Sequence, residues 1–196
     1  MAGIDYEVPT WSQIYDMLLS QAQKIRVQDY KTDIVIGVSR GGLIPARILT
    51  DLLETQKLAT IQISFYQDIA QSTLEPTLKQ TLTVSIVGKK ALLVDDIADT
   101  GRSLKLAQTH LQQHGALEIK TATLYLKCQS LTIPDFYEKQ TSAWVVFPWD
   151  TKETLRKINQ HQLGKRALNR EVAKLVKAGL PKLLAEKLLK DVQEEA

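Results

Sequence analysis

An apolar run that ends in adjacent acids constrains the fold of this chain more than any other feature. Residues 91–104 read ALLVDDIADTGRSL, in which Asp95 and Asp96 follow the apolar residues and Asp99 precedes Thr-Gly-Arg-Ser. The apolar residues predict a buried strand, and two neighbouring carboxylates at its end repel each other and lose hydration. We therefore expect a cationic or hydroxyl-rich ligand here, and the small residues that follow suit a loop around an anion.

Alternating helix and strand patterns predict the fold of the first three quarters of the chain. Helices are expected at 11–25, where Thr10 and Gln13 form a capping box, and at 43–55 and 101–115. Strands are expected at 33–38, 58–65, 89–96, 117–127 and 142–149. This alternation is typical of a three-layer α/β domain with a central parallel sheet. Residues 67–83 show no sustained period and predict a long mobile excursion, which inside a compact domain is usually functional or disordered.

The pattern becomes helical throughout after residue 151. Short amphipathic helices are expected at 153–162, 167–178 and 181–193, separated by Gly164, Gly179 and Pro181. We therefore predict two domains, a main domain over residues 1–152 and a small helical C-terminal extension over 153–196. So short an extension can hardly bury its apolar face alone, so it is expected to pack on the main domain or on a neighbouring subunit. Its role is left open.

Charge and composition exclude several classes of protein. The net charge of +3 is too small to indicate nucleic-acid binding, and residues 151–196 carry the basic excess, with eleven Lys/Arg against six Asp/Glu. A solvated helix face explains that excess better than contact with RNA does. The lone cysteine, Cys128, excludes an internal disulfide framework and a cysteine-rich zinc site. With no secretory signal and no membrane-spanning run, a cytoplasmic location is expected.

The stretch after Asp95 and Asp96 has the chemistry of a phosphate site. In an open parallel sheet, ligands bind beyond the carboxyl ends of the strands, and a helix N-terminus there offers unpaired N–H groups to an anion. Thr100 and Ser103 add hydroxyl donors, and the paired acids would accept hydrogen bonds from sugar hydroxyls, directly or through Mg²⁺. The alternative is a helix capped by Asp99 with solvated acids before it, which leaves the paired acids unexplained.

The 13 residues LLVDDIADTGRSL resemble the signature of type I phosphoribosyltransferases. The resemblance covers about residues 10–152. It implies the fold of this family, which is a three-layer domain with a mobile lid hairpin. It also implies that the ribose and 5′-phosphate of phosphoribosyl pyrophosphate (PRPP) bind here, with the acid pair on the ribose and residues 99–103 on the phosphate. The residues so assigned are Asp95, Asp96, Ile97, Ala98, Asp99, Thr100, Gly101, Arg102 and Ser103.

Two further segments resemble parts of the same family. IVIGVSRGGLIPARIL is similar to its pyrophosphate loop, which assigns Ser39, Arg40, Gly41 and Gly42 to the leaving diphosphate and suggests a cis Ser39–Arg40 peptide bond. An ordinary strand-to-helix turn with a surface arginine is the alternative. ISFY, before the 67–83 excursion, resembles the segment that closes over PRPP, which makes Ser64 and Tyr66 lid residues; a loose hairpin tip is the alternative here.

The base specificity is predicted from two later segments. Lys127 donates hydrogen bonds but cannot accept them, so it suits the carbonyl at position 6 of a purine and not the amino group of adenine. Trp144 offers a plane for stacking, and backbone groups near Val145 could bond the edge of the base. This pattern resembles the xanthine/guanine/hypoxanthine branch, in which Asp150 matches an acid that places a metal–pyrophosphate complex. Alternatively, Trp144 and Trp149 are core residues, which we favour for Trp149, and Lys127 is a solvated strand end.

The resemblance implies a Mg²⁺-dependent purine salvage enzyme. It would transfer ribose 5-phosphate from PRPP to N9 of a 6-oxopurine, with Asp99 as general base and with Asp95, Asp96 and Asp150 near the metal. A homodimer or homotetramer is expected. The alternatives are an enzyme for adenine or another base, and a non-catalytic PRPP-sensing regulator that binds nucleic acid. The sequence does not rank guanine, hypoxanthine and xanthine.

Overall fold

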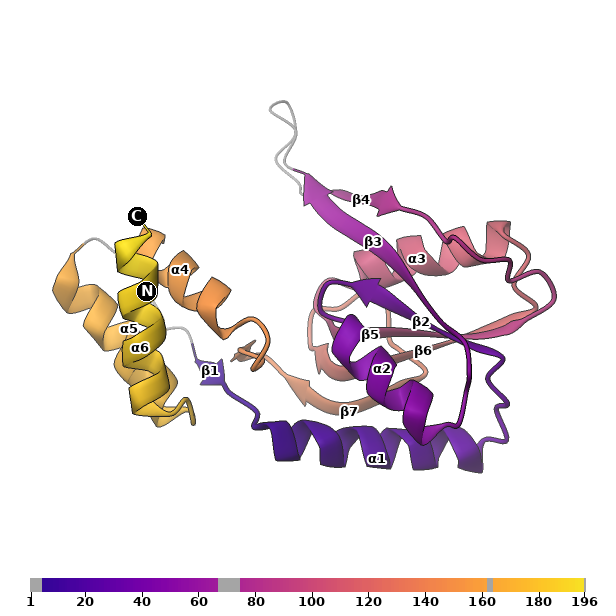
Figure 1. Ribbon diagram of the computed structural model, residues 1–196, viewed down its shortest axis with the longest axis horizontal. Coiled ribbons are helices and arrows are strands. Elements are labelled where there is room, and N and C mark those ends of the chain that lie inside the picture. Colours follow the sequence, from indigo (N-terminus) through magenta and orange to yellow (C-terminus); the bar gives the residue numbers. More distant parts are fainter. Residues whose placement is uncertain (1–4, 67–74, 162–163, 196) are drawn as a thin grey trace. The chain divides into compact units, whose positions relative to one another are not determined.

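The computed structural model describes residues 5–66, 75–161 and 164–195, which belong to two compact units (Figure 1). One unit comprises Tyr15–Thr141, and the other combines Met1–Ile14 with Ser142–Ala196. Helix α1 (Trp11–Val27) begins in the second of these units and continues into the first, and the Thr10–Gln13 capping box predicted at its start is present, with bonds of 2.8 and 3.2 Å.

The Tyr15–Thr141 unit is built on a six-stranded sheet with the order β4-β3-β2-β5-β6-β7. All neighbouring strands are parallel except β3 and β4, which are antiparallel. The strands are β2 (Ile34–Ser39), β3 (Leu58–Tyr66), β4 (Glu75–Gln80), β5 (Lys90–Ala98), β6 (Glu118–Lys127) and β7 (Phe136–Thr141). The predicted central parallel sheet is thus confirmed.

Helices cover both faces of this sheet. Successive side chains of a strand point to opposite faces, so a single strand contacts a different helix on each side. Ile34, Ile36 and Val38 of β2 join the buried cluster that includes Leu104, Ala107 and Leu111 of α3 (Arg102–Gln113). Gly37 points the other way, toward α2 (Leu43–Leu52), where an added Cβ would lie 3.0 Å from that of Ala46. The sheet therefore lies between helices, which confirms the three-layer α/β fold.

The last strand of the sheet differs from the prediction. The run 142–149 was expected to supply it, but only Trp144–Val145 form a strand, β8, which pairs with β1 (Tyr6–Glu7) in a separate two-stranded sheet. The edge position next to β6 is taken by β7, whose only buried residue is Phe136. Residues 75–80 form β4, although they lie in the predicted excursion. Both strands are polar edge strands, so neither carries the apolar signal of a buried strand.

The helical tail predicted after residue 151 is present as α4 (Thr151–His161), α5 (Lys165–Lys177) and α6 (Lys182–Glu194). Its core joins α4, α5, α6 and Val146, with Tyr6 and Val8 packed against it. The Tyr6 hydroxyl donates a 2.9 Å hydrogen bond to Glu171 of α5. The tail thus buries its apolar face together with the N-terminal segment. Within the described residues, no helix combines the length and apolar content needed to cross a membrane.

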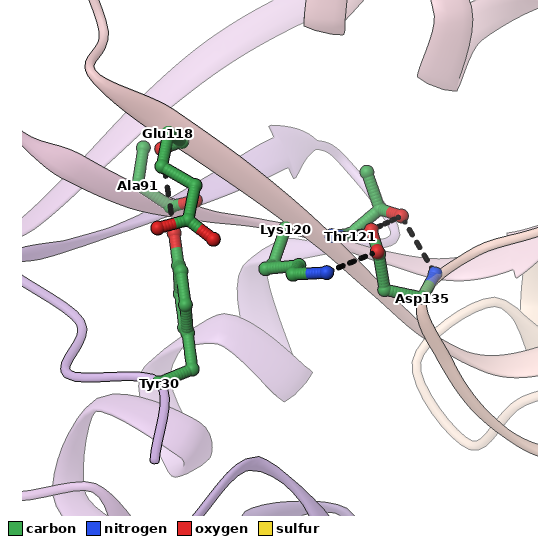
Figure 2. Close-up of polar contacts among 6 residues, drawn as sticks. All are labelled: Tyr30, Ala91, Glu118, Lys120, Thr121 and Asp135. Carbon is green, nitrogen blue, oxygen red and sulfur yellow. Dashed lines mark hydrogen bonds and ion pairs between the residues drawn. The ribbon is translucent and has the colours of Figure 1, made fainter. Parts of the chain in front are cut away.

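Two polar clusters hold β5, β6 and β7 together at the ends opposite the acids (Figure 2). The Tyr30 hydroxyl lies 2.9 Å from the carbonyl oxygen of Ala91 and 3.3 Å from that of Glu118. Burial raises the pKa of this hydroxyl, and the Glu118 carboxylate adds to the effect. Asp135, just before β7, accepts hydrogen bonds from Lys120 Nζ at 3.0 Å and from the backbone and hydroxyl of Thr121 at 2.8 Å each.

Replacing Asp135 should destabilise the sheet edge. Burial favours the neutral acid, but the bonds from Lys120 and Thr121 outweigh it and lower the pKa of Asp135. The stabilisation is therefore full above pH 4 and is lost as the pH falls through the folded-state pKa. Asp135→Ala should lower the free energy of unfolding by about 1–3 kcal/mol at pH 7, and less in acid. Urea denaturation followed by circular dichroism measures this, with the exposed Asp51→Ala as control; equal losses in both variants would contradict it.

Candidate functional site

The paired acids lie at the carboxyl end of β5, where they line a cavity of about 500 Å³ in the Tyr15–Thr141 unit. The strand runs two residues past Asp96, to Ala98, so the acids belong to the strand itself. The cavity is lined by Phe65 and by an unbroken stretch of the chain, Asp95, Asp96, Ile97, Ala98, Asp99, Thr100, Gly101, Arg102, Ser103 and Leu104. The structure therefore gathers all nine residues that the sequence assigned to the ribose and 5′-phosphate around one hollow.

The start of α3 leaves backbone donors available at this cavity. The residue before the helix is Gly101, with φ of 76°, so no side chain at the N-cap position bonds the start of the helix. The alternative in which Asp99 caps the helix is therefore wrong. The backbone N–H of Arg102 donates a long, 3.4 Å hydrogen bond to Thr100 Oγ1. The other N–H groups of the first turn and the positive end of the helix dipole together favour an anion.

The loop between β2 and α2 lies directly against the acids. A Cβ added to Gly41 would fall 2.1 Å from Asp96 Oδ2, and one added to Gly42 would fall 2.4 Å from the carbonyl oxygen of Val94. Only glycine allows so close an approach at these positions. The Ser39–Arg40 peptide bond is cis, as the resemblance suggested. Two segments far apart in the sequence, at Gly41 and at Asp96, thus meet at the carboxyl ends of the central strands.

The acid pair is electrostatically strained. Burial raises the pKa of Asp95 well above its ordinary value, and the neighbouring Asp96 carboxylate raises it further. The backbone N–H of Asp96 donates a 3.0 Å bond to Asp95 Oδ1, which partly offsets this effect. A ligand that brings hydroxyl donors or a cation to the pair would relieve the repulsion.

The turn after β6 lies against residues 99–103, called here the phosphate loop after its predicted ligand, and contains a residue that was not predicted from the sequence. Gln129 Nε2 donates a 2.8 Å hydrogen bond to Asp99 Oδ1. The backbone N–H of Leu131 donates to the Thr100 carbonyl at 3.0 Å. Since Ala98 of β5 pairs with Leu126 of β6, Lys127 stands level with Asp99. Phe65 was also missed, because nothing in its sequence neighbourhood separates a cavity-lining aromatic from a core residue.

The residues predicted for the lid are only partly described. Ser64 is half-buried in β3 and pairs with Thr77 of β4. Tyr66 ends β3, but its side chain and residues 67–74 lie outside the described part of the structure. At the start of β4, Glu75 forms a 3.2 Å ion pair with Arg102 at the start of α3. The lid role of Ser64 and Tyr66 stays a prediction.

Three predicted residues belong to the other unit. Trp144 is exposed and Val145 is buried in β8, while Asp150 precedes α4 and is half-buried. Trp149 stacks on Phe147 with ring centroids 4.7 Å apart. The purine-binding role of Trp144, Val145 and Lys127 stays a prediction. The metal role of Asp150 also stays a prediction.

The donor set at the cavity suits magnesium carried by a ligand. Among the residues that the structure describes, no three His, Cys, Asp or Glu side chains gather where they could hold a metal ion. Mg²⁺ prefers oxygen ligands, keeps several waters and is usually held by one or two carboxylates together with substrate phosphates. Asp95 and Asp96 supply such carboxylates, so the site fits a magnesium ion that a phosphorylated ligand completes.

Comparison with known proteins identifies the family. Residues 10–154 match the phosphoribosyl transferase domain family. Xanthine-guanine phosphoribosyltransferase from Nitratidesulfovibrio vulgaris (strain Hildenborough) is 32% identical over 73% of this chain and 83% of its own length. The purine phosphoribosyltransferase from Pyrococcus horikoshii Ot3 superposes with a TM-score of 0.68, at 36% identity over 74% of this chain and 94% of its own. In fold alone, the xanthine-guanine-hypoxanthine phosphoribosyltransferase from Helicobacter pylori is also similar, with a TM-score of 0.66 at 20% identity, over 80% of this chain and 99% of its own. The family match over most of the chain and the 32% identical relative show that this chain belongs to the type I phosphoribosyltransferase family.

Proposed function

We propose that this protein is a purine salvage enzyme that transfers ribose 5-phosphate from PRPP to N9 of a 6-oxopurine. The products are the nucleoside monophosphate and pyrophosphate. The observation that carries the proposal is the cavity at the end of β5, where an acid pair and an uncapped helix start lie within nine residues. The related xanthine-guanine phosphoribosyltransferases support the choice of base.

The phosphorylated sugar would be held at both of its polar ends. Residues 99–103 offer the N–H groups of the α3 start and the Thr100 and Ser103 hydroxyls to the 5′-phosphate. Asp95 and Asp96 would accept hydrogen bonds from the ribose hydroxyls, which removes the repulsion within the pair. The sugar is then fixed while positive charge develops at its anomeric carbon, which is the role of a positioning site.

The leaving diphosphate would lie against the Ser39–Gly42 loop. The backbone of this loop, which lies against Asp96 at Gly41, and the Arg40 guanidinium would supply the donors. Mg²⁺ bound to the phosphate oxygens, with Asp95, Asp96 and Asp150 as its candidate protein ligands, would neutralise the charge that develops on the leaving group. Removing Mg²⁺ with EDTA is therefore expected to abolish pyrophosphate release.

Asp99 is the proposed general base. As N9 attacks the anomeric carbon and the bond to pyrophosphate breaks, the purine must lose the proton on N7, and Asp99 at the cavity wall would accept it. Lys127, level with Asp99 on the neighbouring strand, would donate to the carbonyl at position 6. The base would thus be held by its oxygen and deprotonated at a nitrogen of its imidazole ring. The family resemblance assigns stacking of the ring to Trp144 and contact with its edge to backbone groups near Val145.

One assay tests the function. The protein is incubated with PRPP, Mg²⁺ and either guanine, hypoxanthine, xanthine or adenine, and pyrophosphate release is measured. We expect release with at least one 6-oxopurine and at least tenfold less with adenine, because the Lys127 ammonium has no acceptor for the amino group of adenine. Activity with adenine alone would overturn the base assignment. PRPP binding without release for any base would favour a sensor.

The oligomeric state is proposed from the same resemblance as a homodimer or homotetramer. Sedimentation equilibrium of the whole chain distinguishes these from the 22.0 kDa monomer. A monomer at micromolar concentration would contradict this part of the proposal.

A further inference from the structure

The turn that follows β6 is attached to the phosphate loop at three points. Gln129 Nε2 bonds Asp99 Oδ1 at 2.8 Å, and the N–H of Leu131 bonds the Thr100 carbonyl at 3.0 Å. At the third point, a Cβ on Gly101 would fall 2.6 Å from the backbone nitrogen of Thr132. Such closeness fixes the position of the turn relative to the loop, and two of the three contacts need no particular side chain on the turn.

Gln129 is the exception, because its contact is made by the side chain alone. The turn that carries it closes with a 3.0 Å bond from the N–H of Ser130 to the carbonyl oxygen of Lys127. A second bond, from Ser130 Oγ to the Thr132 carbonyl at 2.9 Å, stiffens the next two residues. The amide of Gln129 is therefore presented to Asp99 from a backbone that is held on both sides.

We propose that Gln129 is a positioning residue for Asp99, which it holds in the orientation needed to take the proton from the purine. The inference rests on the proposed function of the site. The amide donor occupies Oδ1 of Asp99, so Oδ2 is left to accept the N7 proton.

Gln129 is uncharged, so replacing it leaves the charged groups near Asp99 in place. These groups are Asp95 and Asp96 on the same strand, Arg102 at the start of α3 with its ion-paired partner Glu75, and Lys127 at the end of β6. A loss of turnover in the variant therefore reports the lost hydrogen bond and not a change in the local charge.

Replacement by leucine keeps the bulk of the side chain and removes the donor. Gln129→Leu should lower kcat about three- to tenfold, the range expected for one hydrogen bond to a partly solvated charge. PRPP affinity should change less than twofold, because the proposed contact acts on the base and not on the sugar phosphate. Gln129→Glu also removes the donor and adds a second acid beside Asp99, so it should not restore kcat. Cys128→Ser, at an exposed position of the same turn, is the matched control.

A second measurement does not depend on turnover. In ¹⁵N-labelled protein without substrate, the side-chain amide resonances of Gln129 should be shifted by Asp99→Asn, which replaces the carboxylate that accepts the hydrogen bond, and should not be shifted by Asp51→Asn. Gln129 resonances that Asp99→Asn leaves in place, or an unchanged kcat in Gln129→Leu, would overturn the positioning role. A protein in which Asp99→Asn shifts these resonances but whose wild type releases no pyrophosphate would refute the proposed function and leave the Gln129–Asp99 contact standing.

Discussion

Asp99→Asn should lower kcat for a 6-oxopurine by about 10²–10⁴-fold, the usual contribution of a positioned general base. The amide has nearly the same shape, but it cannot take up the proton that leaves N7. Because Asp99 is an exposed residue at the cavity wall, the fold should tolerate the change. The dissociation constant for PRPP should stay within about threefold, since the proposed donors to the 5′-phosphate are backbone groups and hydroxyls. Initial rates of pyrophosphate release and calorimetric titration with PRPP measure the two quantities.

The split between rate and affinity is what identifies a base. Asp51→Asn, on an exposed turn of α2, serves as control and should change neither quantity. If Asp99→Asn weakens PRPP binding as much as it slows turnover, then Asp99 holds the sugar phosphate and another group accepts the proton. The double variant with Gln129→Leu adds a further test, because Gln129 should have almost no remaining effect on kcat once the base is absent.

The parts of the fold predicted from the sequence are those with strong local signals. The buried strands β2 and β5 carry continuous apolar runs, and the start of α1 carries a capping box, so each could be recognised without its neighbours. The edge strands β4 and β7 could not, because mostly polar edge strands lack that signal. The apolar run at 142–149 was misassigned for the converse reason. Its Val146 is buried in the helical tail's core, and apolar content alone does not say which core a segment joins.

The candidate site also contains residues that could be predicted from the sequence and residues that could not. The nine residues from Asp95 to Ser103 are contiguous, so a motif could assign them together, and the structure brings them to one cavity. Gln129 could not be found like this, because its contact depends on the register of β5 against β6, which sets Lys127 level with Asp99. Register depends on the pairing of whole strands and leaves no mark on the turn that follows.

Gly101→Ala should disable the phosphate loop, and its structural surroundings explain why. The residue has φ of 76°, a left-handed conformation that costs an L-residue about 1–2 kcal/mol. In addition, the new Cβ would lie 2.6 Å from Thr132 N and 2.8 Å from Ser130 Oγ. A backbone atom cannot move aside as a side-chain end can, so the loop must shift away from the turn after β6. We expect PRPP affinity to fall at least tenfold, as measured by calorimetry.

Gly88→Ala separates the cost of the left-handed backbone conformation from the cost of the overlap between the new Cβ and the turn after β6. Gly88 has a similar φ of 69°, but among the described residues no atom lies within 4 Å of its added Cβ. It should therefore lose only about 1–2 kcal/mol of stability and keep its PRPP affinity. Gly101→Ala should lose about 1–3 kcal/mol more, for the overlap with Thr132. If urea denaturation finds the two variants equally stable and both bind PRPP normally, the loop does not depend on its contact with the turn. Because Gln129 reaches Asp99 from that turn, such a result would also weaken the case that the turn positions the base.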